Sequence, residues 1–599
     1  MPGEPSAPRV SPGPNSEPVG VERRSRRRWV PVVAGLLVFL LGIRDIAMVV
    51  RPHLWERVKV IDHVLPGTVD TALVHGVAAA ALVVTGALLI LLSHALRRRK
   101  RRAWRSVVAI LAISLLLHFV HRPDLGDLAT WLPVDGLLLA ALVFFRREFF
   151  AQGDPTTRWR ALVAFVGLTL ASFAVGVVLI EVRRDEVSGQ VDFAKVAKHV
   201  VYGLVGVTGP LHFESDRVGD LIAATLVAMG ALIALTTAYL IFRPAEPRAA
   251  LGASDEQRMR QLLASHGDRD SLGYFALRRD KSVIWSPTGK SCIAFRVLSG
   301  VMLASGDPLG DPEAWPGAIK EFMLEAERHA WVPAVLGCSE LGGEVWTRET
   351  HMSALEFGDE AVVDVAEFSL DGRTMRNVRQ MVNRVERAGY TAEVIRVREL
   401  TVEQATSYRT EAALWRGTET ERGYSMALGR FGDPADGECV GVAAKKDGVL
   451  RAFLHFVPWG SDGLSLDLMR RDRAADPGLN EFLITAALRA CPDLGVKRVS
   501  LNFAVFRSAL ERGGRLGAGP ILRGWRALLI FASRWFQIES LYRFNAKFQP
   551  DWLPRFVVYP GAGDLPRIAM AALEAEAFIV WPHPRVQQLR KLLRLGSPA

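Results

Sequence analysis

The hydrophobic and polar positions divide the chain into two regions of different character. Up to about residue 243 the apolar residues come in long runs, and six of them are about 16 to 25 residues long, enough to cross roughly 30 Å of hydrocarbon as helices. These runs lie near 29–50, 72–96, 104–120, 131–146, 160–182 and 218–242. Further on, the apolar residues follow the shorter periods of globular strands and helices. The pattern predicts about six transmembrane helices followed by an α+β domain.

Changes in composition predict the domain boundaries. The first residues are rich in Pro, Ser, Gly and Arg, which is typical of a disordered basic segment. The globular part has two successive α+β units of similar size and element order, typical of a tandem acyltransferase-like (GNAT-type) fold. The predicted parts are a disordered N-terminus 1–28, a transmembrane domain 29–243, a linker 244–254, a first subdomain 255–395 and a second subdomain 396–599.

Basic residues predict the orientation of the membrane domain. Clusters of arginine and lysine precede the first apolar run, separate the second from the third and the fourth from the fifth, and follow the sixth. With six crossings these clusters all lie on one side, and the positive-inside rule makes that side cytoplasmic. We therefore expect both termini and the globular part in the cytoplasm. The formal net charge of +11 favours an anionic partner, either nucleic acid or lipid head groups.

The stretch 464–506 has the pattern strand, loop, helix, strand, and it holds the first candidate site. Asp467 and Arg470 come where its first strand ends, a carboxylate and a guanidinium shortly before a helix N-terminus. The free N–H groups and partial positive charge of a helix N-terminus suit an anionic or carbonyl group. By spacing alone, such a pair is more often a routine salt bridge. His455 and His351 read as core or surface histidines.

A basic amphipathic helix is predicted at 373–389. Its apolar stripe consists of valines and methionines, and it carries five arginines. Such a charge run is either the solvated face of a connecting helix or a surface for RNA or anionic lipid. The candidate substrate-binding residues on it are Arg376, Arg379 and Arg384.

Several kinds of chemistry lack their sequence signatures. The chain has no phosphate-binding loop motif, no H-E-x-x-H zinc motif and no G-x-S-x-G nucleophile motif. The four cysteines include no C-x-x-C pair, so we expect reduced thiols and no metal site. An acetyl-CoA enzyme of this fold carries a glycine pair after its central strand, where this chain reads RDRAADPGLNEF. We therefore expect no cofactor and a different acyl donor.

Five stretches, in order along the globular part, give a more specific resemblance. They are SGVMLASGDPLGDP (299–312), EFSLDGRTMRNVRQMVNRVERAGY (367–390), RGYSMALGRF (422–431), LDLMRRD (466–472) and LYRFNAKFQPDWLPRFVVY (541–559). In this series, behind a membrane domain, the chain resembles the aminoacyl-phosphatidylglycerol synthases, also called the phosphatidylglycerol lysyltransferase or multiple peptide resistance factor family. The resemblance covers roughly 270–575.

The resemblance implies an aminoacyltransferase of the bacterial plasma membrane. It would move an aminoacyl group, lysyl or alanyl, from aminoacyl-tRNA to a glycerol hydroxyl of phosphatidylglycerol and so lower the negative charge of the membrane. By the same resemblance Asp467, Arg470 and Lys547, in the second subdomain, are the catalytic candidates. Asp467 would orient the hydroxyl or the donor ammonium, Arg470 would clamp the lipid phosphate, and Lys547 would stabilise the developing oxyanion.

The same motifs supply further candidates and leave some alternatives open. Tyr542, Arg543 and Asn545 are expected to bind substrate, and so is Asn502, where relatives often read F-N-L-G and this chain lacks the glycine. Long family members carry more membrane spans that act as a flippase, and some carry a lysyl-tRNA synthetase module. From its length this chain is expected to use charged tRNA from the general pool. The oligomeric state is open, a homodimer being one alternative.

Two other readings compete with this one. Aminoacyl transfer to a different lipid or to a cell-wall precursor uses the same doubled fold. A non-catalytic lipid flippase or transporter with a degenerate domain belongs to another class. The presence of Asp467, Arg470 and Lys547 speaks against degeneracy, and the small number of spans speaks against an autonomous transporter.

Overall fold

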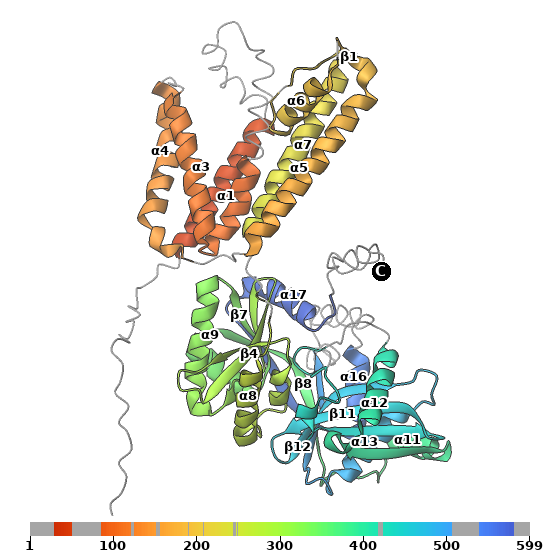
Figure 1. Cartoon of the computed structure of the whole chain (residues 1–599). Coiled ribbons are helices and arrows are strands. Elements are labelled where there is room, and N and C mark those ends of the chain that lie inside the picture. The colour runs from red at the N-terminus through yellow and green to blue at the C-terminus, as the bar shows by residue number, and fades with distance from the viewer. Residues whose placement is uncertain are drawn as a thin grey trace, which may run out of the picture. The chain divides into compact units, whose positions relative to one another are not determined.

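The computed structural model describes most of both regions. The described residues are 29–50, 85–120, 125–150, 156–189, 191–207, 209–242, 247, 249–416, 423–505 and 538–579. The predicted disordered N-terminus 1–28, the first part of the second predicted span and part of the predicted linker 244–254 lie outside them. The chain forms a helical unit, residues 1–150 with 159–242, and a second unit, residues 151–158 with 243–599 (Figure 1).

The helical unit bears out the predicted apolar helices wherever it is described. Its elements are α1 (Trp29–Val50), a helix at Thr85–Arg97, α3 (Arg101–Val120), α4 (Leu125–Phe144), α5 (Thr156–Val182), α6 (Phe193–Leu204) and α7 (Asp216–Phe242), with a two-stranded pair of β1 (Val187–Ser188) and β2 (His212–Phe213). Three of them are long and apolar enough to cross a membrane, over Trp29–Ala47, Ala161–Val182 and Asp216–Ile241. Two shorter apolar helical segments lie in two other predicted spans: Thr85–Arg97 in the span 72–96, and Val134–Phe144, the last part of α4, in the span 131–146.

Charged residues inside the apolar helices of this unit pair with one another. Arg44 of α1 contacts Asp45 at 2.9 Å and Asp135 of α4 at 3.6 Å. Because an isolated charge is costly at membrane depth, mutual pairing is what makes charged residues tolerable there. The ion pair also joins α1 to α4.

The second unit begins with helices and strands that alternate along the chain. Its first part comprises α8 (Ala253–His266), η4 (Gly273–Leu277), β3 (Ser282–Trp285), β4 (Ser291–Leu298), β5 (Val301–Ser305), β6 (Leu309–Gly310), α9 (Trp315–His329), β7 (Val332–Cys338), α10 (Glu340–Thr350) and β8 (Ser353–Asp364). Its second part comprises α11 (Arg376–Arg387), β9 (Tyr390–Arg396), α12 (Val402–Arg416), β10 (Val440–Lys446), β11 (Val449–Trp459), β12 (Gly463–Arg471), α13 (Leu479–Ala490), β13 (Arg498–Val505), α16 (Ile538–Asn545), η8 (Ala546–Phe548), β14 (Asp551–Tyr559) and α17 (Leu565–Ala575).

One sheet runs through the whole second unit, in the order β3-β4-β5-β7-β14-β8-β13-β12-β11-β10-β9, with β6 paired to β4. The same order of elements occurs twice in it. In the first half, the antiparallel meander β3–β5 is followed by helix α9 and by strand β7, which is parallel to β5. In the second half, the antiparallel meander β10–β12 is followed by helix α13 and by strand β13, which is parallel to β12. This repetition is the doubled α+β arrangement predicted from the element order.

The two halves of the sheet exchange their last strands. After β7 the chain passes through α10 into β8, which pairs with β13 of the second half. After β13 it returns through α16 into β14, which pairs with β7 of the first half. The strands β8 and β14 pair with each other over nine residues, from Asp551↔Val362 to Tyr559↔Ser353. The exchange makes the sheet continuous, which element order along the sequence did not predict.

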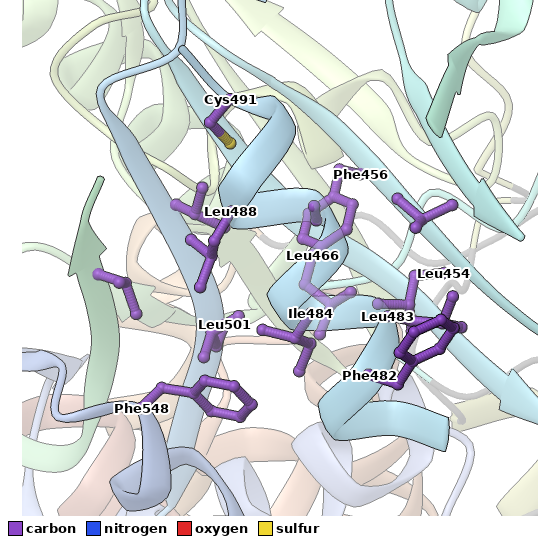
Figure 2. Packing of buried hydrophobic residues seen from close by; sticks show 14 of the residues in the cluster. Leu454, Phe456, Leu466, Phe482, Leu483, Ile484, Leu488, Cys491, Leu501 and Phe548 are labelled. Carbon is purple, nitrogen blue, oxygen red and sulfur yellow. The ribbon is translucent and has the colours of Figure 1, made fainter. Parts of the chain in front are cut away.

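Helix α13 forms the centre of the core of the second half. Its apolar residues recur at three and four, and Phe482, Leu483, Ile484 and Leu488 are all buried. Figure 2 shows them packed against strand residues such as Leu454, Phe456, Leu466 and Leu501. Each fully buried side chain of this size stabilises the fold by about 1.5–3 kcal/mol. The packing fixes the strands on which the candidate site lies.

A buried ion network joins the two halves of the sheet. Arg555 of β14 is 3% exposed, and its guanidinium contacts the carboxylates of Asp270 at 2.7 Å and Glu360 at 3.0 Å. Asp307, the first aspartate of the stretch SGVMLASGDPLGDP, lies beside them and accepts hydrogen bonds from the backbone N–H and hydroxyl of Ser339. Three carboxylates therefore surround one guanidinium. Burial and the neighbouring Asp270 raise the pKa of Asp307 to about 7.

We expect Asp307→Asn to remove part of the pH dependence of stability. Between about pH 4 and pH 7 the native Asp307 holds a proton that the unfolded chain has lost, so the free energy of unfolding falls as pH rises through this window. The asparagine variant, which resembles the protonated form, should lose this slope. Thermal unfolding of the purified full chain at pH 5 and pH 7.5 measures it. The exposed control Asp493→Asn should keep the wild-type slope, and an unchanged slope in Asp307→Asn would contradict the assignment.

Candidate functional site

The candidate site lies where the parallel strands β12 and β13 separate. They pair only from Gly463↔Arg498 to Ser465↔Ser500. Beyond this point β13 has a register shift against β8, and Asn502 there adopts a φ of 71°. Asparagine tolerates this left-handed conformation better than most residues with a side chain. Its side-chain amide donates to the carbonyl of Leu466 at 2.6 Å and links the separating strands.

A bulge in β12 sets the direction of its functional side chains. Phe456 is opposite Leu466 and His455 is opposite Leu468, so Asp467 is the extra residue. Without a bulge, residues three apart in a strand point to opposite faces. Here Arg470 is opposite Phe453 of β11, and Phe453 and His455, two residues apart, point to the same face of the sheet. Asp467 points to that face too, because its carboxylate contacts His455. The bulge therefore brings Asp467 and Arg470, predicted to act together, to one face of the sheet.

Asp467 is held by two hydrogen bonds. One carboxylate oxygen accepts the backbone N–H of Leu428 at 2.6 Å, and the other lies 2.6 Å from Nδ1 of His455. The side chains of His455 and Asp467 are only 1% and 4% exposed. A carboxylate next to Nδ1 favours the tautomer that carries its proton there and leaves Nε2 as an acceptor. His455 is buried, as the core alternative predicted, but it is not isolated, because it contacts the candidate catalytic carboxylate.

The segment 423–434, which contains most of the RGYSMALGRF motif, is anchored from several directions. Arg278 donates to the carbonyls of Gly423 and Ala427. The carboxylate of Glu576 accepts the backbone N–H groups of Tyr424 at 2.7 Å and Ser425 at 3.1 Å. Since Leu428 also donates to Asp467, this motif forms a rigid wall beside the candidate catalytic carboxylate.

Between this wall and α12 lies a pocket of about 420 Å³, and Asp467 and Leu468 contribute to its lining. The remaining lining residues come from η4's C-terminal side, from α12 and from the wall: Arg279, Arg409, Ala412, Ala413, Arg416, Ala427, Gly429, Arg430, Phe431, Gly432, Asp433 and Pro434. Four arginines therefore share a pocket with one candidate catalytic carboxylate. Such a lining suits an anionic group next to a hydrogen-bond donor.

The arginines of the pocket differ in what holds them. Arg430 contacts Asp436 at 2.7 Å and Glu256 at 3.0 Å, and Arg279 contacts Asp433 at 2.8 Å. Burial acts to raise the pKa of Asp436, but hydrogen bonds from Arg430 and Arg260 outweigh it and leave this pKa below its usual value. Arg430 is consequently fixed in an ion network, and it shapes the pocket.

Lys547 lies in a different environment from Asp467. It belongs to η8, and its ammonium contacts the carboxylate of Glu481, in the first turn of α13, at 2.7 Å. Phe548, next to it, packs in the core around α13 (Figure 2). In the described part of the chain, Lys547 and Asp467 share no hydrogen bond or ion pair. The catalytic role of Lys547 stays a prediction.

The other predicted residues have mixed surroundings. Asn545 is buried and donates to the carbonyl of Leu501 at 3.2 Å, which is a structural contact. The ring of Tyr542 lies 5.3 Å from that of Trp552, and Arg543 is exposed. On α11, Arg379 donates to the carbonyls of Leu370 and Gly372 and holds the preceding loop.

The two other predicted arginines of α11 point outward. Arg376 and Arg384 are exposed, and the helix buries Val378, Val382 and Val385. The amphipathic pattern predicted this division, whereas only the structure separates Arg379 from the two exposed arginines. A ligand can therefore reach Arg376 and Arg384 without disturbing the fold.

The fold and the pocket define a membrane protein whose second unit is a doubled acyltransferase-like domain. Residues 260–559, half of the chain, match the family model of the C-terminal part of phosphatidylglycerol lysyltransferase, and residues 26–242 match the transmembrane region of lysyl-tRNA synthetase. The chain belongs to the phosphatidylglycerol lysyltransferase family.

The chain is similar to curated relatives and to solved structures. The chain is 38% identical over 591 residues to the lysylphosphatidylglycerol biosynthesis bifunctional protein LysX of Rhodococcus jostii, covering 96% of this chain and 51% of the relative. It thus spans about half the length of the curated relatives it matches. The C-terminal domain of a putative lysylphosphatidylglycerol synthetase from Agrobacterium fabrum has 23% identity and a TM-score of 0.46, covering 53% of this chain and 95% of that one. L-PGS from Bacillus licheniformis has 21% identity and a TM-score of 0.47, covering 56% of this chain and 98% of that one.

Proposed function

We propose that this chain transfers a lysyl group from lysyl-tRNA to a glycerol hydroxyl of phosphatidylglycerol. The family supplies the reaction class, and the name of the relatives favours lysyl over alanyl. The observation that carries the proposal is the buried carboxylate of Asp467, fixed by two hydrogen bonds at the edge of a pocket lined by arginines. This arrangement suits an acceptor that carries both a phosphate and a hydroxyl.

The reaction requires few groups because the ester of aminoacyl-tRNA is already activated. The glycerol oxygen forms a bond to the lysyl carbonyl carbon, the bond to the ribose oxygen breaks, and the hydroxyl proton passes by way of Asp467 to that ribose oxygen. Asp467 already accepts one hydrogen bond on each oxygen, and an ionised carboxylate offers about four acceptor positions. It therefore retains the capacity to accept the proton of the glycerol hydroxyl and orient its oxygen for attack.

The exposed arginines of α11 suit the donor. Arg376 and Arg384 offer guanidinium groups to RNA phosphates, which is the sequence-independent part of RNA binding. Because charged tRNA is cytoplasmic, the second unit then faces the cytoplasm, as the basic clusters predict. A lysyl group on the lipid lowers the negative charge of the membrane. Arg470 and Lys547 stay predicted catalytic residues.

Transfer in vitro tests the proposal. Purified full chain is mixed with radiolabelled lysyl-tRNA and vesicles of phosphatidylglycerol, and label is counted in the organic extract. We expect label in the lipid with phosphatidylglycerol, and loss of that label after ribonuclease treatment of the donor. Label that enters phosphatidylcholine vesicles equally would contradict the proposed acceptor, and efficient transfer only from alanyl-tRNA would contradict the lysyl assignment.

His455 is predicted to act through Asp467 as a positioning residue. We expect His455→Ala to lower kcat about tenfold or more, because one carboxylate oxygen loses its partner. His455→Asn, whose amide can donate near the position of Nδ1, should recover part of the loss. The KM for the lipid should change little in either variant. The control His351→Asn concerns an exposed histidine outside the site, and equal losses in the alanine and asparagine variants would contradict the positioning role.

A further inference from the structure

We propose that the pocket between α12 and the segment 423–434 binds the phosphoglycerol head group of the acceptor lipid, an assignment that rests on the proposed function. The phosphodiester would lie against the arginines, with Arg409 as its principal ligand, and a glycerol hydroxyl would reach Asp467. Sequence motifs alone had assigned the lipid phosphate to Arg470.

The cationic side of the pocket is built on one face of α12. The helix contributes four lining residues that line up along its axis, because each of the last three lies three, four or seven positions after the first: Arg409, Ala412, Ala413 and Arg416. The two alanines leave room between the arginines, and Ala412 is buried next to Tyr408, one turn before it. One helix surface therefore presents two guanidiniums separated by small side chains.

Arg409 is the side chain most available to an incoming anion. Arg430 and Arg279 are held by the carboxylates of Asp436, Glu256 and Asp433. Arg409 is exposed, and within the described residues it has no hydrogen bond or ion pair. Its fork geometry matches a phosphodiester, which accepts two parallel N–H groups. The fixed arginines add positive potential without having to move.

The remaining lining favours a lipid head group over a nucleotide of the tRNA. Binding of single-stranded nucleic acid relies on bases stacked on exposed aromatic faces. Phe431 is the one aromatic side chain among the described lining residues, and it is buried, with ring contacts to Phe453 and His455. The arginines also repel the two ammonium groups of a lysyl ester. A phosphodiester next to hydroxyls satisfies both the arginines and Asp467.

Binding measured without catalysis tests this assignment. The probe is glycerophosphoglycerol, the deacylated head group, titrated into detergent-solubilised full chain by calorimetry. We expect Arg409→Ala to weaken binding about tenfold, since a charge-assisted hydrogen bond is lost. The control Arg489→Ala removes an exposed arginine of α13 outside the pocket and should bind as wild type. Inorganic phosphate should bind more weakly than glycerophosphoglycerol, because it cannot also reach Asp467.

The outcomes separate this assignment from the reaction itself. Head-group binding that depends on Arg409, in a protein that transfers no lysyl group, supports the pocket and overturns the proposed function. Lysyl transfer with a KM for phosphatidylglycerol that is equal in wild type and Arg409→Ala overturns the pocket assignment. So does an Arg409→Ala variant in which only the KM for lysyl-tRNA rises, because the pocket then serves the RNA.

Discussion

Asp467→Asn should lower the rate of lysyl transfer to phosphatidylglycerol by about a hundredfold or more, the usual size of a lost general-base contribution. The amide keeps the size of the side chain and can still accept the N–H of Leu428, while His455 can adopt the other tautomer. The fold should therefore survive. Single-turnover transfer of radiolabelled lysine from lysyl-tRNA into lipid measures the effect on chemistry.

Asp462→Asn is the matched control for this substitution. Asp462 lies just before β12 and pairs at the surface with Lys497 at 3.3 Å, and such pairs contribute little to stability. It should transfer lysine at the wild-type rate. An Asp467→Asn variant that retains full activity while properly inserted in the membrane would remove Asp467 from the mechanism.

Arg555→Met should be more destabilising than any other substitution named above. Methionine leaves Glu360, which is fully buried, and Asp270, which is 7% exposed, without their cation. Breaking a buried ion pair in this way costs about 3–5 kcal/mol. Because Arg555 lies on the exchanged strand β14, the loss should affect both halves of the sheet. Chemical unfolding of the purified full chain, followed by tryptophan fluorescence, measures the change in free energy.

A surface arginine and a second substitution make this prediction specific. Arg328→Met breaks only an exposed pair with Glu325, so it should change the free energy of unfolding by less than about 1 kcal/mol. Adding Glu360→Gln to Arg555→Met should recover part of the loss, because one uncompensated charge disappears. A double variant as unstable as Arg555→Met alone would show that the network acts through packing and not through charge.

Much of the fold followed from periodicity. The apolar runs predicted the described helices of the helical unit except α6, and the two meanders and their following helices were readable from alternation and spacing. The exchange of β8 and β14 could not be predicted from the sequence, because pairing between distant strands depends on tertiary contacts that local patterns do not encode. The predicted subdomain boundary at residue 395 stays a prediction.

The candidate site was only partly predictable. Motif resemblance selected Asp467, and the structure places it in a pocket. Its partner His455 was missed because it lies on the neighbouring strand, and only the register and the bulge at Asp467 bring the two together. The pocket arginines left a weak signal: Arg409 and Arg416 are seven residues apart, the spacing of two helical turns, and Arg430 belongs to the RGYSMALGRF motif. Nothing in the sequence indicated that these segments share one pocket.

The most direct test of the account is the lipid content of a host that lacks aminoacylated lipids and expresses the full chain. Mass spectrometry of the extracted lipids should show a phosphatidylglycerol species heavier by one lysyl residue, absent from cells that carry Asp467→Asn. No new lipid, in a host with abundant phosphatidylglycerol and verified membrane expression, would contradict the proposed reaction. A different lipid carrying lysine would contradict the proposed acceptor.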